Sequence, residues 1–267
     1  MSGKQIFIPL ISPLDDQSRI CESSVRRLLH CSQPFADGYI PCLTSGEGWR
    51  LDADNWRRML QLTLANAQGK KVIAGIERTT TAEVLEHALL AQKMGAHGVM
   101  FTSPFIPGTR QEDIFDHYQT IHDATDLDIY VYNESALSGN EKTFDTLLAI
   151  ARLPRVKGLK DSPSLPRTQP QIEQLRKEGV AYFAGWEMDL ARELETDGNV
   201  VSLANLEPGL CRLAIPARQQ SVANLIETLN GYFDLGADDW YAQVKKELKA
   251  RGVITTDRVF PEKETQR

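Results

Sequence analysis

One short apolar run ends in a lysine: it reads Val156-Lys157-Gly158-Leu159-Lys160 and is followed directly by Asp161-Ser162-Pro163. If the run is a strand, its side chains alternate between two faces, so Val156, Gly158 and Lys160 share one face. An amine with little access to water is less readily protonated, and only the neutral amine attacks a carbonyl. Lys160 is therefore a candidate nucleophile. The alternative is a lysine that extends from a strand end into solvent.

Strand-like runs alternate with amphipathic stretches along almost the whole chain. We expect strands at 6–11, 38–42, 71–75, 98–102, 127–132, 156–160, 181–184 and 200–203, and helices around 22–32, 53–67, 81–94, 112–124, 143–152, 169–178 and 187–196. About eight βα repeats, with no doubly wound fingerprint after the first strand, favour a closed parallel (β/α)8 barrel, the TIM barrel.

No low-complexity stretch or Pro/Gly/Ser linker divides the 267 residues. We expect the barrel to span residues 1–205. Residues 206–267 are mainly helical in pattern and are predicted to form an extension that packs on the barrel. The chain is thus predicted to be one structural domain overall.

The charge pattern argues against nucleic acid as a partner. The formal net charge is -6, and the 30 Lys and Arg residues are dispersed among 36 Asp and Glu residues. The apolar run at residues 6–10 is far too short for a signal peptide or a membrane span. We therefore expect a cytoplasmic protein that binds a small molecule.

Neither the cysteines nor the histidines are spaced as metal ligands. The four cysteines form no C-x-x-C pair, and the five histidines show no spacing that would bring ligands together on one element. We expect no metal and no separate cofactor.

In a barrel of this kind, active sites lie at the carboxyl ends of the strands. The second predicted strand is followed by the small polar turn Thr44-Ser45-Gly46-Glu47, which can cradle a carboxylate or relay a proton, or can be simply a turn. In the fifth, Tyr130 and Tyr132 share a face and are expected to point into the barrel. A phenol near the amine can exchange protons with the substrate, although a purely structural tyrosine is the alternative.

Five motifs at the strand ends occur in one order and spacing, and with them the chain resembles the dihydrodipicolinate synthase and N-acetylneuraminate lyase family. The motifs are Thr44-Ser45-Gly46-Glu47, Ser103-Pro104-Phe105 with Gln111-Glu112, Tyr132-Asn133, Gly158-Leu159-Lys160-Asp161, and Gly198-Asn199-Val200-Val201-Ser202 with Ala204-Asn205. The resemblance covers nearly the whole chain. It implies a class I aldolase that forms a Schiff base between its own lysine and a 2-oxo acid.

The resemblance also assigns roles to single residues. Lys160 is the implied Schiff-base lysine, and Tyr132 the phenol that shuttles protons. Thr44 and Ser45 are the implied pair that binds the carboxylate of the 2-oxo acid.

Two further residues are candidates for substrate binding. Glu187, after the seventh predicted strand, can hold hydroxyls of a longer substrate; the alternative is a surface carboxylate at a helix N-terminus. Val201 belongs to the motif that ends in Ser202.

Three positions depart from the family pattern. Ile106 stands where the family commonly has a second tyrosine of the proton relay, often donated across a dimer interface. Leu137 replaces the arginine with which the synthase binds the carboxylate of its second substrate, and Leu43 replaces a glycine. These changes argue against true dihydrodipicolinate synthase activity.

The leading hypothesis is a class I aldolase or lyase that acts on pyruvate or on a 2-keto-3-deoxy sugar acid together with an aldehyde. A catalytically impaired homologue that binds a 2-oxo acid is one alternative, and a Schiff-base hydratase or dehydratase on a related sugar acid is another. The resemblance implies a homodimer or a homotetramer.

Overall fold

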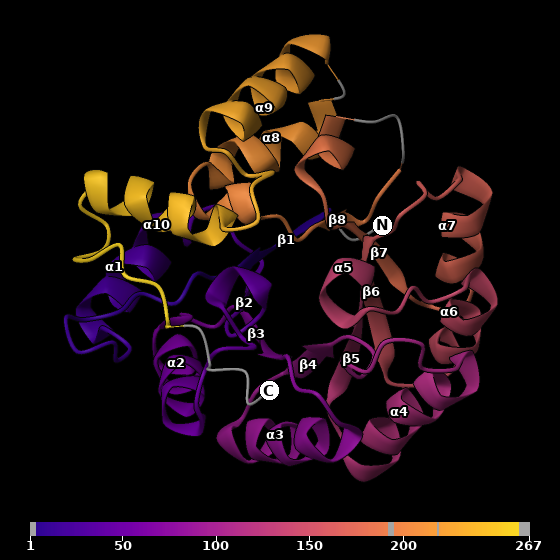
Figure 1. Ribbon diagram of the computed structural model, residues 1–267. Helices are drawn as coiled ribbons and strands as arrows, with labels where there is room; N and C mark the ends of the chain where they lie inside the picture. Colours follow the sequence, from indigo (N-terminus) through magenta and orange to yellow (C-terminus); the bar gives the residue numbers. More distant parts are fainter. Residues whose placement is uncertain (1–3, 192–194, 218, 262–267) are drawn as a thin grey trace.

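Eight parallel strands close into a barrel in the computed structural model, which describes residues 4–191, 195–217 and 219–261. Each strand pairs with the next, and β8 pairs with β1 (Figure 1). The strands are β1 (Gln5–Pro9), β2 (Gly38–Ile40), β3 (Lys71–Ile76), β4 (Gly98–Phe101), β5 (Asp128–Glu134), β6 (Val156–Ser162), β7 (Ala181–Ala184) and β8 (Gly198–Asn199). The predicted TIM barrel is confirmed.

Helices surround the barrel, and the last three lie together on one side of it, shown in orange and yellow in Figure 1. The α-helices are α1 (Glu22–Ser32), α2 (Ala53–Asn66), α3 (Thr81–Met94), α4 (Gln111–Ala124), α5 (Ser135–Ser138), α6 (Phe144–Ala151), α7 (Gln169–Lys177), α8 (Pro208–Ala217), α9 (Gln220–Tyr232) and α10 (Trp240–Ala250). Three short 3-10 helices are η1 (Thr44–Gly46), η2 (Glu187–Ala191) and η3 (Ser202–Asn205). None of the described helices is long and apolar enough to cross a membrane. The predicted boundary at residue 205, between the barrel and its C-terminal extension, stays a prediction.

The predicted strand at 200–203 is wrong. The strand is Gly198–Asn199, and the N–H of Val200 makes one more bond to the carbonyl of Ala184. The carboxylate of Glu187 then accepts the N–H groups of Ser202 and Leu203, so the backbone leaves the ladder and tightens into η3. The apolar run at 200–203 resembles a strand in sequence because Val200, Val201 and Leu203 are all buried.

The predicted helix at 187–196 is wrong in type. Its described first part, Glu187–Ala191, is the 3-10 helix η2. Residues 192–194 lie outside the described part of the chain.

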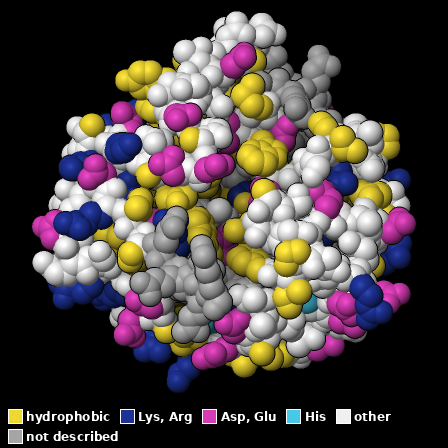
Figure 2. Space-filling view, viewed as in Figure 1, with side chains coloured by type: hydrophobic (Ala, Val, Ile, Leu, Met, Phe, Trp, Pro, Cys, Tyr) yellow, Lys and Arg dark blue, Asp and Glu magenta, His cyan; other side chains and the backbone are white. Residues whose placement is uncertain are grey.

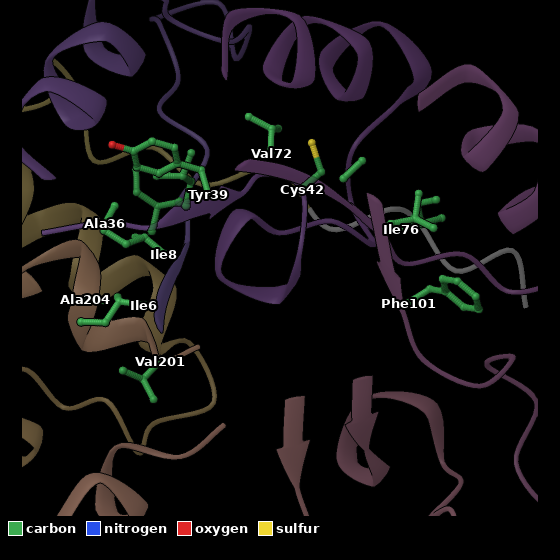
Figure 3. Packing of buried hydrophobic residues seen from close by; sticks show 14 of the residues in the cluster. Ile6, Ile8, Ala36, Tyr39, Cys42, Val72, Ile76, Phe101, Val201 and Ala204 are labelled. Atoms are coloured by element: carbon green, nitrogen blue, oxygen red, sulfur yellow. The ribbon is translucent and has the colours of Figure 1, made fainter. Parts of the chain in front are cut away.

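Two apolar layers fill the barrel and its surroundings. The outer layer lies between strands and helices, and part of it is shown in Figure 3. The inner layer consists of Phe7, Ile40, Leu43, Ile73, Met100, Tyr130, Tyr132, Phe183 and Val200. Both tyrosines of β5 therefore point inward as predicted, whereas Ile129 and Val131 belong to the outer layer.

Gly158 makes room for this inner layer. A Cβ at Gly158 would lie 2.7 Å from the ring of Tyr130 and 2.9 Å from the ring of Phe183. Lys160 follows on the same face of β6, so the two rings fill the barrel beneath the amine.

Candidate active site

A cavity of about 320 Å³ opens among the carboxyl ends of β5, β6 and β7 and the C-terminal segment that leads into α10. The face seen in Figure 2 is hollowed near its centre, with hydrophobic and acidic side chains around the hollow. The cavity lining includes five aromatic residues, Trp49, Tyr132, Trp186, Trp240 and Tyr241; three acidic residues, Glu134, Glu187 and Asp238; and Lys160. Predominantly apolar walls with a few polar groups are typical of a small-molecule site.

Lys160 points into this cavity from β6 and is only 5% exposed. Its Nζ lies 3.9 Å from the centre of the Tyr132 ring. Burial lowers the pKa of Lys160 from its ordinary value of 10.5 to about 8, and the carboxylates of Glu134, Glu77 and Glu187 act in the opposite direction. A fraction of the amine is therefore neutral near neutral pH, which a solvent-exposed lysine would not be.

Tyr132, whose ring contacts the amine of Lys160, also meets Thr44. The Oη of Tyr132 lies 3.3 Å from the Oγ1 of Thr44. Burial raises the pKa of Tyr132 well above its ordinary value, and the nearby carboxylate of Glu134 raises it further. The phenol therefore stays protonated at neutral pH and can donate a hydrogen bond.

Glu77 is a site residue that the sequence reasoning missed. It directly follows β3, it is 1% exposed, and its Oε1 accepts a hydrogen bond of 2.5 Å from Thr44 Oγ1. Burial raises the pKa of Glu77 from 4.5 to about 7, while the Thr44 hydroxyl and the charge of Lys160 lower it. The available signal was a charged residue directly after a buried strand, at the end where barrels carry their active sites.

Glu134 is a second missed residue, at the last position of β5. It lines the cavity, and burial raises its pKa while the charge of Lys160 lowers it. Glu187 also lines the cavity and is buried, so it is not the surface carboxylate that was the alternative. Its Oε1 accepts N–H groups from Ser202 at 2.7 Å and Leu203 at 3.1 Å.

The two remaining predicted residues lie differently. Ser45 is buried in η1 beside Thr44 and is not part of the cavity lining. The side chain of Val201 packs in the outer apolar layer, as Figure 3 shows, and does not line the cavity. The geometry thus brings together Lys160, Tyr132, Thr44 and Glu187, and it does not support a role for the Val201 side chain.

A buried polar network fixes the strand ends behind Lys160. Asp161 accepts hydrogen bonds of 2.8 Å from Asn133 and from Arg167. Lys142 donates to the carbonyl of Tyr132 at 3.0 Å, and burial lowers the pKa of Lys142 to about 7. These bonds hold β5 and β6 in register next to the amine and the phenol.

Two of the residues that the resemblance marks as departures, Ile106 and Leu137, have different surroundings. Ile106 is 53% exposed and does not line the cavity, whereas Leu137 lines it. Lys160 is the one Lys or Arg among the lining residues that the structure describes. The described residues contain no group of three or more His, Cys, Asp or Glu that could hold a metal ion.

The fold and the site define a class of protein: a closed (β/α)8 barrel with a buried lysine and a phenol at the carboxyl ends of its strands. Sequence comparison then identifies the family. The Dihydrodipicolinate synthetase family matches residues 2–261, so the chain belongs to that family.

Individual relatives are distant. The chain is 29% identical over 182 residues to a 4-hydroxy-tetrahydrodipicolinate synthase of Anaplasma marginale (strain Florida), which is 67% of this chain and 60% of the relative. It is 27% identical over 260 residues to the synthase of Methylococcus capsulatus, with coverage of 93% and 88%. The solved structure of the chloride-inhibited synthase of Acinetobacter baumannii complexed with pyruvate has a TM-score of 0.85 at 22% identity, covering 98% and 94%, and supports the fold. The match to the first of these spans less than two thirds of that relative's length.

Proposed function

We propose that the protein is a Schiff-base-forming class I aldolase or lyase that acts on pyruvate or on a pyruvate-releasing 2-keto-3-deoxy sugar acid. The observation that carries the proposal is the buried amine of Lys160, 3.9 Å from the Tyr132 ring and with its pKa lowered to about 8. Family membership supports it, as does the likeness to a solved synthase structure that contains pyruvate.

The proposed reaction begins when the neutral amine of Lys160 attacks the keto carbon. Loss of water gives an iminium ion, whose positive nitrogen draws electrons from the neighbouring carbon and allows an enamine to form. A carbon–carbon bond is then made or broken through the enamine. Tyr132 donates and accepts protons, and the η1 turn with Thr44 and Ser45 binds the carboxylate of the 2-oxo acid.

The second substrate differs from that of the synthase in this proposal. The resemblance aligns Leu137 with the synthase arginine, and Leu137 lines the cavity, so in this proposal a second carboxylate has no cation there. Glu187 lines the cavity, and in this proposal its carboxylate accepts a hydroxyl of a longer substrate such as a sugar acid. We propose an aldehyde with hydroxyl groups as the partner, and a homodimer or homotetramer as the assembly, which light scattering on the purified protein measures.

A borohydride trap tests the Schiff base directly. Incubation with pyruvate and borohydride is expected to add one reduced pyruvate to the protein, detected by mass spectrometry. Lys160→Ala should abolish the adduct. Lys157→Ala is the matched control, because Lys157 lies on the opposite face of the same strand, exposed, and donates to the carbonyl of Pro154. No adduct on the wild type, or an adduct that survives Lys160→Ala, would contradict the proposal.

Two alternatives keep the same fold. A catalytically impaired 2-oxo-acid-binding homologue is favoured by Ile106 and Leu137, and a single aldol turnover above background eliminates it. A Schiff-base hydratase or dehydratase would release water without cleaving a carbon–carbon bond, so product analysis separates it from an aldolase.

A further inference from the structure

Side chains from three different strand ends form one continuous hydrogen-bonded line. Tyr132, at the end of β5, lies 3.3 Å from Thr44 after β2, and Thr44 lies 2.5 Å from Glu77 after β3. A hydroxyl carries a single proton, so when Glu77 is ionised, Thr44 donates to it and accepts from Tyr132. When Glu77 is protonated, it can donate to Thr44, and Thr44 can then donate to Tyr132. The line can therefore pass a proton in either direction.

Glu77 is not held as a structural glutamate would be. Its buried Oε2 has no hydrogen-bond partner among the described residues. Glu47 is equally buried, but its carboxylate is paired with Lys245 and accepts the N–H of Phe260 at 2.7 Å. A buried carboxylate with a hydrogen-bond partner on only one of its two oxygens is costly to ionise, so Glu77 holds its proton more readily than an ordinary glutamate does.

The hydrogen bonds from Tyr132 through Thr44 to Glu77 all lie within one subunit. Ile106, which the resemblance aligns with the family's second relay tyrosine, is 53% exposed and is not among the residues that line the cavity. The second partner of Thr44 in this structure is Glu77 instead. We propose that Glu77 stores and supplies the proton of a relay that runs through Thr44 to Tyr132 within a single subunit; the inference rests on the proposed Schiff-base function.

The proton count of the reaction balances with this relay. When the neutral amine of Lys160 condenses with a ketone, the oxygen leaves as water with two protons. One comes from the amine and one from the carboxyl of Glu77 by way of Thr44 and Tyr132. The products are a positive iminium ion and a negative Glu77 carboxylate. The iminium then loses a proton from the adjacent carbon, and the relay returns it to Glu77, leaving a neutral enamine.

The charges around Glu77 fit one shared proton. Lys160 faces it from β6 and Tyr132 from β5, while Thr44, Cys42 and the backbone N–H of Trp49 face it from the loop after β2. Arg78 adjoins Glu77 in sequence. The carboxylates of Glu134 and Glu187, like that of Glu77, interact with the charge of Lys160. The reactive form has a neutral amine and a protonated Glu77, so one proton resides on the pair. The rate should therefore pass through a maximum between the two ionisations of the pair.

The exchange of pyruvate methyl protons for deuterium tests the relay, because enamine formation needs no aldehyde. We would follow the exchange by proton NMR from pH 6 to 9.5, with borohydride trapping in parallel, for the wild type and for Glu77→Gln and Glu77→Asp. Glu77→Gln should still give the trapped adduct after long incubation, but exchange about 100-fold more slowly and without the fall in rate at high pH. Glu77→Asp should recover part of the rate and the high-pH fall. Glu86→Gln, an exposed glutamate on α3, is the matched control and should exchange at the wild-type rate.

Several results would overturn the inference. A Glu77→Gln protein that exchanges within threefold of the wild type with the same pH profile excludes the relay. If that protein does not fold, as judged by circular dichroism, Thr44→Val decides: loss of the high-pH fall supports the relay, and its retention overturns it. If the wild type gives no adduct with pyruvate, the proposed function itself fails, and the relay with it.

Discussion

At the scale of single residues, the site is defined by ionisable groups that the barrel deprives of water. Lys160 and Glu77 are both buried, and burial moves their pKa values toward each other, to about 8 and about 7. Groups of opposite charge type with converging pKa values can exchange a proton at little cost near neutral pH. In the proposed function, the lowered pKa of Lys160 makes its amine available as a nucleophile.

Because Glu77 is buried, replacing its carboxylate with a neutral group is expected to stabilise the folded protein. The folded state raises the pKa of Glu77 from 4.5 to about 7, so the folded protein binds this proton more tightly than the unfolded chain. Relative to the protonated form, the Glu77 side chain therefore destabilises the folded protein increasingly as the pH rises from about 4.5 to about 7. Above that pH the destabilisation is constant, at about 3 kcal/mol. Glu77→Gln should raise the free energy of unfolding at pH 8 by up to this amount, with a smaller gain at pH 4.5.

Urea unfolding at the two pH values measures this gain. Glu86→Gln serves as the exposed control and should show no such pH-dependent difference. A Glu77→Gln protein less stable than the wild type at pH 8 would show that the carboxylate has a structural role.

At the scale of elements, strand β6 couples packing to chemistry. Gly158 leaves space for two aromatic rings inside the barrel, and Lys160 stands above them on the same face. A side chain at Gly158 would therefore disturb the layer on which the amine rests.

Gly158→Ala is expected to lower the free energy of unfolding by about 1–3 kcal/mol, because its Cβ would overlap the rings of Tyr130 and Phe183 at 2.7 and 2.9 Å. Gly231→Ala is the control, since nothing lies within 4 Å of a Cβ there and the residue is inside helix α9. That change should be neutral or stabilising. Equal effects of the two substitutions in urea unfolding would refute the packing argument.

At the scale of the whole molecule, the C-terminal segment is tied to the site by a buried ion pair. Lys245 of α10 is paired with Glu47, which directly follows the η1 turn that carries Thr44. Both side chains are fully buried. The last helix of the described chain therefore supports the loop after β2, which carries Thr44.

Lys245→Met should lower the free energy of unfolding by about 3–5 kcal/mol, because it leaves the Glu47 carboxylate buried without its counter-charge. The exposed neighbour Lys246 gives the control Lys246→Met, which should be nearly neutral. Urea unfolding compares the two proteins. Similar losses from both would mean that the ion pair does not hold the C-terminal segment in place.

Much of this architecture could be predicted from the sequence because it is local. Alternation along β5 and β6 placed Tyr132 and Lys160 on inward faces, and both predictions are confirmed by the barrel interior. The prediction that Val156 shares this face is wrong: Val156 packs in the outer layer, because the pairing of β6 with β5 shifts by one residue between Val156 and Gly158. The run at 200–203 misled, because hydrophobicity reports burial and not backbone conformation. Its conformation is decided by Glu187, 15 residues before Ser202 in the chain.

By itself, the sequence determined the eightfold repeat and the inward lysine, since both depend on periodicities of a few residues. Only the tertiary structure decided that Thr44 bonds both Glu77 and Tyr132, and how far the pKa values of Glu77 and Lys160 move. The physical reason is that these two hydrogen bonds join residues from three separate strands, which come together only when the barrel closes. Burial, which sets the charge of each group, is likewise a property of the closed barrel and not of any one strand.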